Sequence, residues 1–234
     1  MINDKRLLAI VPARSGSKRL PNKNTLNLAG KPLIAWSIEA GLQSKYVDRV
    51  VVSTNCASIA NISKDYGADV PFMRPDELST DMATTIDVVR HTLDMLTQQN
   101  DFYDYIVLLQ PTSPLRNEVN IDEAAELLIC KSANGIVGVT EVEHPVEWTN
   151  TLPVDRCMEG FFPKEYRNIR SQDIPLRYRI NGSIYLNKIQ SVLDEKALIL
   201  NENSYAYIMP RSASVDIDSE FDFNIANCIF QTRD

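Results

Sequence analysis

One short loop of the sequence concentrates positive charge. Four cations fall within ten residues there, namely Arg14, Lys18, Arg19 and Lys23. Arginine can bind phosphate in a bidentate manner, lysine adds a point charge, and a glycine such as Gly16 lets backbone amides approach a ligand closely. The loop is therefore a candidate polyphosphate cradle, although it has neither the P-loop spacing nor the dinucleotide-binding fingerprint. A solvated basic loop is the alternative interpretation.

A pair of aspartates near the C-terminus is the second candidate. Asp216 and Asp218 are two residues apart, and such residues point to the same side of an extended backbone. Their carboxylates could then hold one hard divalent cation such as Mg²⁺. The alternative is helix capping by Asp218 or Ser219, because a helix is expected from about residue 219.

Two further polar groups follow expected strands. The loop 110–116 offers amide, hydroxyl and guanidinium groups and is stiffened by two prolines, and a well-built turn is its alternative interpretation. A cluster of Arg170, Arg177, Arg179 and Asn181 could receive a substrate carboxylate, unless the arginines pair with nearby surface acids. No side chain has the setting of an activated nucleophile. Cations together with paired aspartates indicate phosphoryl or nucleotidyl transfer, which depends mainly on positioning and electrostatics.

The composition argues against several other classes of function. The 234 residues are 44% hydrophobic with a net charge of −7, so we expect a buried core and no general attraction to nucleic acid or anionic lipid. No run approaches 18 apolar residues and no cleavage signal follows the N-terminus, so we expect neither a membrane span nor secretion. Four scattered cysteines without a C-x-x-C pair indicate reduced thiols in the cytoplasm.

Alternating apolar runs and amphipathic stretches predict the elements that must position these residues. They indicate an α/β fold with a mostly parallel, twisted sheet flanked by helices. Strands are expected at 6–12, 48–53, 69–73, 105–109, 135–140, 180–187 and 204–209. Helices are expected at 34–42, 56–66, 86–96, 118–130, 188–194 and from about 219. Ligands of such sheets bind at the carboxyl ends of strands, which directs attention to the loops 13–24, 53–56, 74–84 and 110–117.

Residues 141–178 interrupt this rhythm. The segment contains four prolines and many charges, and we interpret it as an excursion inserted into a single domain that spans residues 1–234. It is a candidate for an oligomer contact.

Five motifs, in this order, resemble the acylneuraminate cytidylyltransferases, also called CMP-sialic acid synthetases. They are PARSGSKRLPNKN (12–24), RPDELSTDMATT (74–85), LLQPTSPLR (108–116), RINGSIY (179–185) and SVDIDSEFD (214–222). The resemblance covers nearly the whole chain. It implies a Rossmann-like nucleotidyltransferase domain with a small dimerisation element, and therefore a homodimer. It also implies CMP transfer from CTP to a nonulosonic acid, such as sialic or legionaminic acid, with Mg²⁺ and with release of pyrophosphate.

The resemblance assigns roles to individual residues. The catalytic residues that it implies are Arg14, Lys18, Lys23, Asp216 and Asp218, with the two aspartates as Mg²⁺ ligands. The nucleotide-binding residues are Ala13, Arg14, Ser15, Gly16, Lys23, Asn24, Arg74, Ala83 and Thr85. The acceptor-binding residues are Gln110, Arg170, Arg179, Asn181 and Tyr185. Thr85 stands where the family more often has serine.

Some features depart from the family pattern. Residues 141–178 do not closely match the sialic acid enzymes, and Glu147 and Trp148 stand where some relatives carry a basic group. Residues 81–85 resemble sialic and legionaminic acid enzymes more than pseudaminic acid ones. The acyl decoration of the acceptor therefore stays open.

Two alternative functions share parts of this pattern. A 3-deoxy-manno-octulosonate cytidylyltransferase has a similar first loop, but Lys23, Asn24 and the LLQPTSPLR motif favour the nonulosonate enzymes. A catalytically inactive nucleotide-binding homologue should have lost a loop cation or one of the paired aspartates. All of them are present in this chain.

Overall fold

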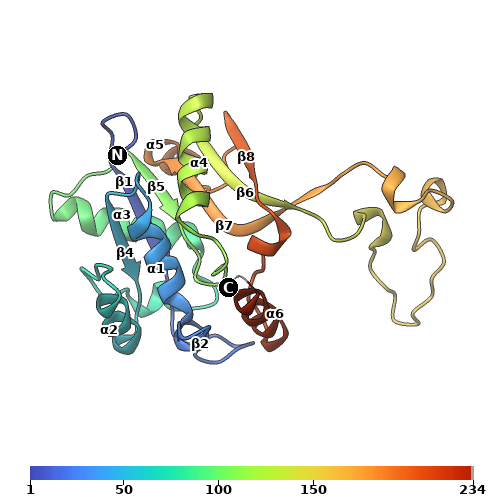
Figure 1. Ribbon diagram of the computed structural model, residues 1–234, viewed down its shortest axis with the longest axis horizontal. Helices are drawn as coiled ribbons and strands as arrows, with labels where there is room; N and C mark the ends of the chain where they lie inside the picture. Colours follow the sequence, from blue (N-terminus) through green and yellow to red (C-terminus); the bar gives the residue numbers. More distant parts are fainter. Residues whose placement is uncertain (233–234) are drawn as a thin grey trace.

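The aliphatic and β-branched runs of the sequence form one six-stranded sheet, which the computed structural model describes together with its helices over residues 1–232 (Figure 1). Its strands are β1 (Leu7–Pro12), β4 (Arg49–Ser53), β5 (Tyr105–Leu108), β6 (Gly135–Glu141), β7 (Tyr178–Lys188) and β8 (Ser204–Ile208). Their order across the sheet is β4-β1-β5-β7-β6-β8. Only β7 is antiparallel to its neighbours β5 and β6 among these described strands. The predicted mostly parallel α/β sheet is confirmed, with one reversed strand.

Helices follow the strands where the apolar periodicity predicts them. They are α1 (Leu33–Gln43), α2 (Ala57–Asp65), α3 (Thr85–Gln98), α4 (Glu118–Lys131), α5 (Ile189–Glu195) and α6 (Glu220–Gln231). A capping box closes the N-terminus of α3, α4 and α6, because a polar residue before each helix exchanges hydrogen bonds with the third helical residue. No helix within residues 1–232 combines the length and the apolar character that a bilayer crossing requires.

The two faces of the sheet bury separate sets of side chains. Along β1, Leu7 and Val11 pack on the side covered by α1 and α4, whereas Leu8 and Ile10 pack on the side covered by α3. All of these side chains are fully buried. A strand covered on both faces needs an unbroken apolar sequence, and burial of each such side chain stabilises the fold by about 1.5–3 kcal/mol. The cores thereby fix the positions of the strand ends that carry the polar loops.

The strand expected at residues 69–73 does not form. Asp69 makes a single parallel bridge to Val51 of β4, and the segment then continues without regular structure. Pro71 lacks the backbone N–H that the next ladder bond would need. This prediction was wrong for that reason, although Arg74 still donates its backbone N–H to the Thr54 carbonyl at 2.8 Å.

The chain leaves the sheet between β6 and β7 as a long arm, residues 142–177, that projects away from the body of the molecule (Figure 1). Its two legs start side by side, since Val142 donates a backbone hydrogen bond to the Arg177 carbonyl at 3.0 Å. Beyond that point the arm contains only short 3-10 turns among its described residues. Several apolar side chains on it are exposed, namely Val146, Trp148, Leu152, Val154, Met158, Ile169 and Leu176.

Candidate active site

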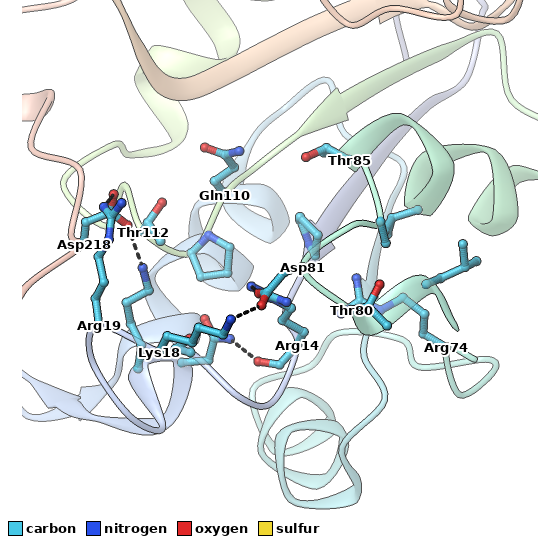
Figure 2. A pocket seen from close by; sticks show the side chains of 18 of the residues that line it. Arg14, Lys18, Arg19, Arg74, Thr80, Asp81, Thr85, Gln110, Thr112 and Asp218 are labelled. Atoms are coloured by element: carbon cyan, nitrogen blue, oxygen red, sulfur yellow. Dashed lines mark hydrogen bonds and ion pairs between the residues drawn. The ribbon is translucent and has the colours of Figure 1, made fainter. Parts of the chain in front are cut away.

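A cavity of about 680 Å³ opens beside the carboxyl ends of β1 and β5 (Figure 2). Three loops that lie far apart in the sequence line it: residues 14–24 after β1, residues 74–85 before α3, and residues 110–112 after β5. Asp218 closes the side nearest α6. Three of the four loops expected to carry the site therefore meet at the edge of the sheet where α/β proteins bind ligands, whereas residues 53–56 do not line the cavity.

Two of the loop cations share one carboxylate. Arg14 Nη2 lies 2.7 Å from Asp81 Oδ1, and Lys18 Nζ lies 2.5 Å from Asp81 Oδ2. Figure 2 shows Lys18 and Asp81 pointing toward each other in the cavity. Hydrogen bonds from Lys18 and Arg14 lower the pKa of Asp81, so this carboxylate is charged at neutral pH.

The other two loop cations, Arg19 and Lys23, pair with Asp218. Arg19 Nη1 lies 3.0 Å from Asp218 Oδ2, and Lys23 Nζ lies 3.2 Å from Asp218 Oδ1. Lys23 also donates to the Ile217 carbonyl at 2.6 Å and is nearly buried. The predicted phosphate cradle and the predicted metal ligand are thus in direct contact.

The remaining predicted residues of the first loop hold its backbone in position. Asn24 is buried and donates from Nδ2 to the Arg14 carbonyl at 3.0 Å. Ala13 extends β1 through a hydrogen bond to Ser53, and Ser15 is held by the Asn55 side chain. Gly16 has a φ of 80°, a left-handed conformation that favours glycine.

Arg74 forms the opposite wall of the cavity. It is only 5% exposed, and its Nε donates to Ser79 Oγ at 3.1 Å. Its buried Nη2 has no hydrogen-bond partner among residues 1–232. Burial, helped by the nearby charge of Arg14, lowers the pKa of Arg74 to about 10, which still leaves it protonated at neutral pH. A buried donor of this kind is suited to an acceptor atom supplied by a ligand. Ala83 and Thr85 line the same wall.

The predicted acceptor residues do not all reach this cavity. Gln110 lines it and lies beside Gly182 of β7. Asn181 is buried and donates from its amide to Ser214 Oγ at 3.0 Å and to Met209 Sδ, so it supports the fold of this region. Tyr185 lies on β7, and burial together with the charge of Asp216 raises its pKa.

The two predicted arginines lie on or next to the arm. Arg179 stands near the start of β7 and pairs with Glu143 at 2.9 Å. Arg170 pairs with Asp173 at 3.2 Å and is largely exposed on the arm. Arg170 is not among the residues that line the cavity of its own chain, and the arm that carries it projects away from the body of the molecule (Figure 1).

Asp216 and Asp218 form an electrostatically coupled pair. Desolvation of its carboxyl raises the pKa of Asp216, and the charge of Asp218 adds to this, whereas a hydrogen bond from Thr112 opposes it. A divalent cation between the two carboxylates would relieve this repulsion. No cluster of three or more possible metal ligands from His, Cys, Asp and Glu occurs in the described chain. Two carboxylates suit Mg²⁺, which usually keeps several waters and binds substrate phosphates. The residues present therefore fit this ion.

Three residues to which the sequence assigned no individual role prove important for this geometry. Asp81 forms ion pairs with two loop cations, although only its place in the RPDELSTDMATT motif pointed to it. Thr112 contacts Asp216 and lines the cavity. Arg116 is fully buried and donates to the carbonyls of Ser183 and Gln110. Its burial lowers its pKa to about 9, and its role is to hold these two backbone segments together.

The sequence matches a family model described as Cytidylyltransferase over residues 8–207. It is similar to the pseudaminic acid cytidylyltransferase of Campylobacter jejuni, with 35% identity over 97% of each chain. It is equally similar to the CMP-N,N'-diacetyllegionaminic acid synthase of Legionella pneumophila, with 35% identity over 97% of each chain. The N-acylneuraminate cytidylyltransferase of Escherichia coli is 38% identical over 97% of this chain, which spans 53% of that protein.

Solved structures share the fold at lower identity. A CMP:2-keto-3-deoxy-manno-octonic acid synthetase complexed with CTP superposes with a TM-score of 0.68 and 16% identity, over 97% of this chain and 99% of the other. The 4-diphosphocytidyl-2C-methyl-D-erythritol synthase of Anaerococcus prevotii superposes with the same TM-score and 13% identity, over 97% and 99% of the two chains. These likenesses concern the architecture of the sheet and its helices.

Proposed function

Because this chain belongs to the cytidylyltransferase family, we propose that it transfers CMP from CTP to the anomeric hydroxyl of a nonulosonic acid and releases pyrophosphate. The observation that carries the proposal is the convergence of the loop cations, Asp218 and the buried Arg74 on one cavity, with Asp216 coupled to Asp218 beside it. The names of relatives with 35–38% identity agree with this reaction class.

The chain supplies binding and charge stabilisation rather than a covalent intermediate. The cations of residues 14–23 would bind the triphosphate and stabilise the charge that develops on departing pyrophosphate. Arg74, whose Nη2 has no hydrogen-bond partner among residues 1–232, would donate to an acceptor atom of the cytidine, with Ala83 and Thr85 beside it. Gln110 would orient the sugar. The anomeric hydroxyl loses its proton to solvent as its oxygen bonds to the α-phosphorus, and the bond from that phosphorus to the α–β bridging oxygen breaks, so that pyrophosphate leaves with the electron pair.

Asp216 and Asp218 would hold Mg²⁺. When bound there, this ion supplies Lewis acidity toward the phosphate oxygens. Ion pairs with Lys23 and Arg19 hold Asp218 beside the cationic loop of residues 14–23. Replacement of Asp216 by asparagine preserves shape but removes one charge. We expect it to lower kcat by about a hundredfold or more, by analogy with other charge-stabilising groups. Full turnover by Asp216→Asn would contradict this assignment.

We also propose that the protein acts as a homodimer in the cytoplasm. Exposed apolar residues on the arm support a contact with a second copy, because these side chains are exposed to water in the single chain. Arg170, carried away from its own cavity, would reach an acceptor only in such an assembly. All four cysteines are free thiols, in keeping with a reducing compartment. Sedimentation of the wild type and of Val154→Asp tests the contact; a monomeric wild type would contradict it.

The reaction is tested by pyrophosphate release with CTP, Mg²⁺ and a panel of acceptors. The panel contains N-acetylneuraminic, diacetyllegionaminic, pseudaminic and deoxy-octulosonic acids, because relatives named for three different nonulosonic acids are similarly close to this chain. Release with a nonulosonic acid supports the proposal and identifies the sugar. Release only with the octulosonate would instead assign the chain to the alternative enzyme, and CTP binding without any release would favour an inactive homologue.

A further inference from the structure

Asp81 occupies the position that an anionic ligand would be expected to take between Arg14 and Lys18. Each of its carboxylate oxygens faces one of these cations, at 2.7 and 2.5 Å. Such a two-oxygen contact resembles the way in which a phosphate group is held. The same cations cannot keep this geometry with Asp81 and bind a triphosphate fully at the same time.

The segment that carries Asp81 is anchored at both ends. We call residues 80–84 the strap. Before it, Ser79 is tied by its hydroxyl to Arg74 Nε and by its carbonyl to Arg14 Nη1 at 3.3 Å. At its C-terminal end, the capping box between Thr84 and Asp87 fixes the start of α3. Within the strap Met82 is 88% exposed, so few packing contacts oppose movement of its centre.

The strap also belongs to the nucleoside side of the cavity. Thr80, Ala83 and Thr84 line the cavity together with Asp81. Breaking the ion pairs of Asp81 with Arg14 and Lys18 would therefore also change the position of the residues expected to hold the cytidine. Electrostatics, and not apolar packing, links the two sides of the site at this point.

We propose that Asp81 is a specificity-determining residue that acts as an internal phosphate surrogate. It holds Arg14 and Lys18 in the nucleotide-free protein, is displaced by the phosphates of the incoming nucleotide, and returns to these cations as pyrophosphate leaves. A polyphosphate carries several negative charges and outcompetes one carboxylate, whereas weaker anions do not. This inference rests on the proposed function, because it assumes that the cations bind the triphosphate.

The test compares Asp81→Asn with Glu77→Gln. Glu77 is exposed on the 3-10 turn that precedes the strap and forms no ion pair with any residue from 1 to 232. Both variants remove one negative charge from the same region. Calorimetry with inorganic pyrophosphate and, separately, with CTP measures the dissociation constants, and thermal unfolding verifies that both variants are folded.

We expect Asp81→Asn to bind pyrophosphate about three- to tenfold more tightly than the wild type, as removal of two exposed ion pairs allows. Glu77→Gln should stay within about twofold of the wild type, and Asp81→Glu should restore weaker binding. The difference should shrink at about 1 M salt, where exposed charges are screened. In turnover, pyrophosphate should inhibit Asp81→Asn more strongly.

Two results would overturn this role of Asp81 while leaving the proposed function intact. One is equal affinity of Asp81→Asn and Glu77→Gln for pyrophosphate. The other is weaker binding by Asp81→Asn, which would mean that Asp81 helps to hold the ligand. A folded wild type that binds neither pyrophosphate nor CTP would overturn both proposals together.

Discussion

Replacing Gly182 by alanine tests whether Gln110 orients the sugar acceptor. Gly182 lies in β7 with a φ of 73°, a conformation that costs a residue with a Cβ roughly 1–2 kcal/mol. A Cβ at this position would stand 2.8 Å from Gln110 Oε1 and 3.5 Å from Ser113 Oγ. The Gln110 amide, as the end of a flexible side chain, must then move away from its present position.

The expected effect separates into stability and kinetics. Backbone strain should lower the free energy of unfolding by about 1–2 kcal/mol. Loss of one neutral hydrogen bond from Gln110, worth about 0.5–1.5 kcal/mol, should raise the acceptor KM by about 2- to 13-fold. The KM for CTP should stay unchanged, because Gly182 is not among the residues that line the cavity beside the cationic loop of residues 14–24.

Gly30→Ala is the matched control for this variant. Gly30 has a φ of 92° in the turn between β2 (Asn27–Leu28) and β3 (Lys31–Pro32), and a Cβ there would meet no atom within 4 Å. It should show a similar loss of stability with wild-type kinetics. Pyrophosphate-release assays at varied acceptor and varied CTP, with denaturant unfolding of each variant, make the comparison. An unchanged acceptor KM in Gly182→Ala, or an equal rise in Gly30→Ala, would refute the reasoning.

Two further substitutions probe the nucleotide wall and the opposite end of the sheet. Arg74→Met should raise the KM for CTP by about 10- to 150-fold and leave the acceptor KM unchanged, because hydrogen bonds from a charged donor contribute about 1.5–3 kcal/mol; an unchanged KM for CTP in steady-state assays would contradict this. At Asp101, burial acts to raise the pKa, but hydrogen bonds from Tyr103, Arg6 and Arg49 outweigh it and the pKa is lowered. The carboxylate therefore stabilises the fold fully above its unfolded pKa of about 3.9, and the contribution is lost as pH falls through the lower folded value. Asp101→Asn should lower the free energy of unfolding by about 1–2 kcal/mol at pH 7, and denaturant titrations should show the difference shrinking below about pH 4; a difference independent of pH would contradict the linkage.

Much of the fold follows from local sequence pattern. The run at residues 6–12 is apolar at nearly every position, which predicts the doubly covered β1. Proline before residue 33 and Ser219 before α6 mark two helix starts that the structure contains. The segment 69–73 has a similar apolar character, yet it forms only one bridge because Pro71 removes a donor. Local propensity does not report whether a neighbouring strand can complete the ladder.

The sequence also could not predict that β7 runs antiparallel to its neighbours. Residues 180–187 predict a strand, but they carry no information about whether its partners run parallel or antiparallel. That depends on the path of the chain through the arm and back to the gap between β5 and β6. The position of Arg170 is decided by the same path, because the arm carries it away from the cavity to which the family pattern assigned it.

The sequence by itself determined which candidate site residues this protein carries and on which loops they lie. Arg14, Lys18, Lys23, Asp216 and Asp218 could be identified because type, spacing and order along the chain are local properties. Only the tertiary structure decided that Asp81, separated from Arg14 by 67 residues, forms ion pairs with Arg14 and Lys18 of the first loop. Ion pairing depends on distance in space, and that distance is set by packing of the strands whose ends hold the loops.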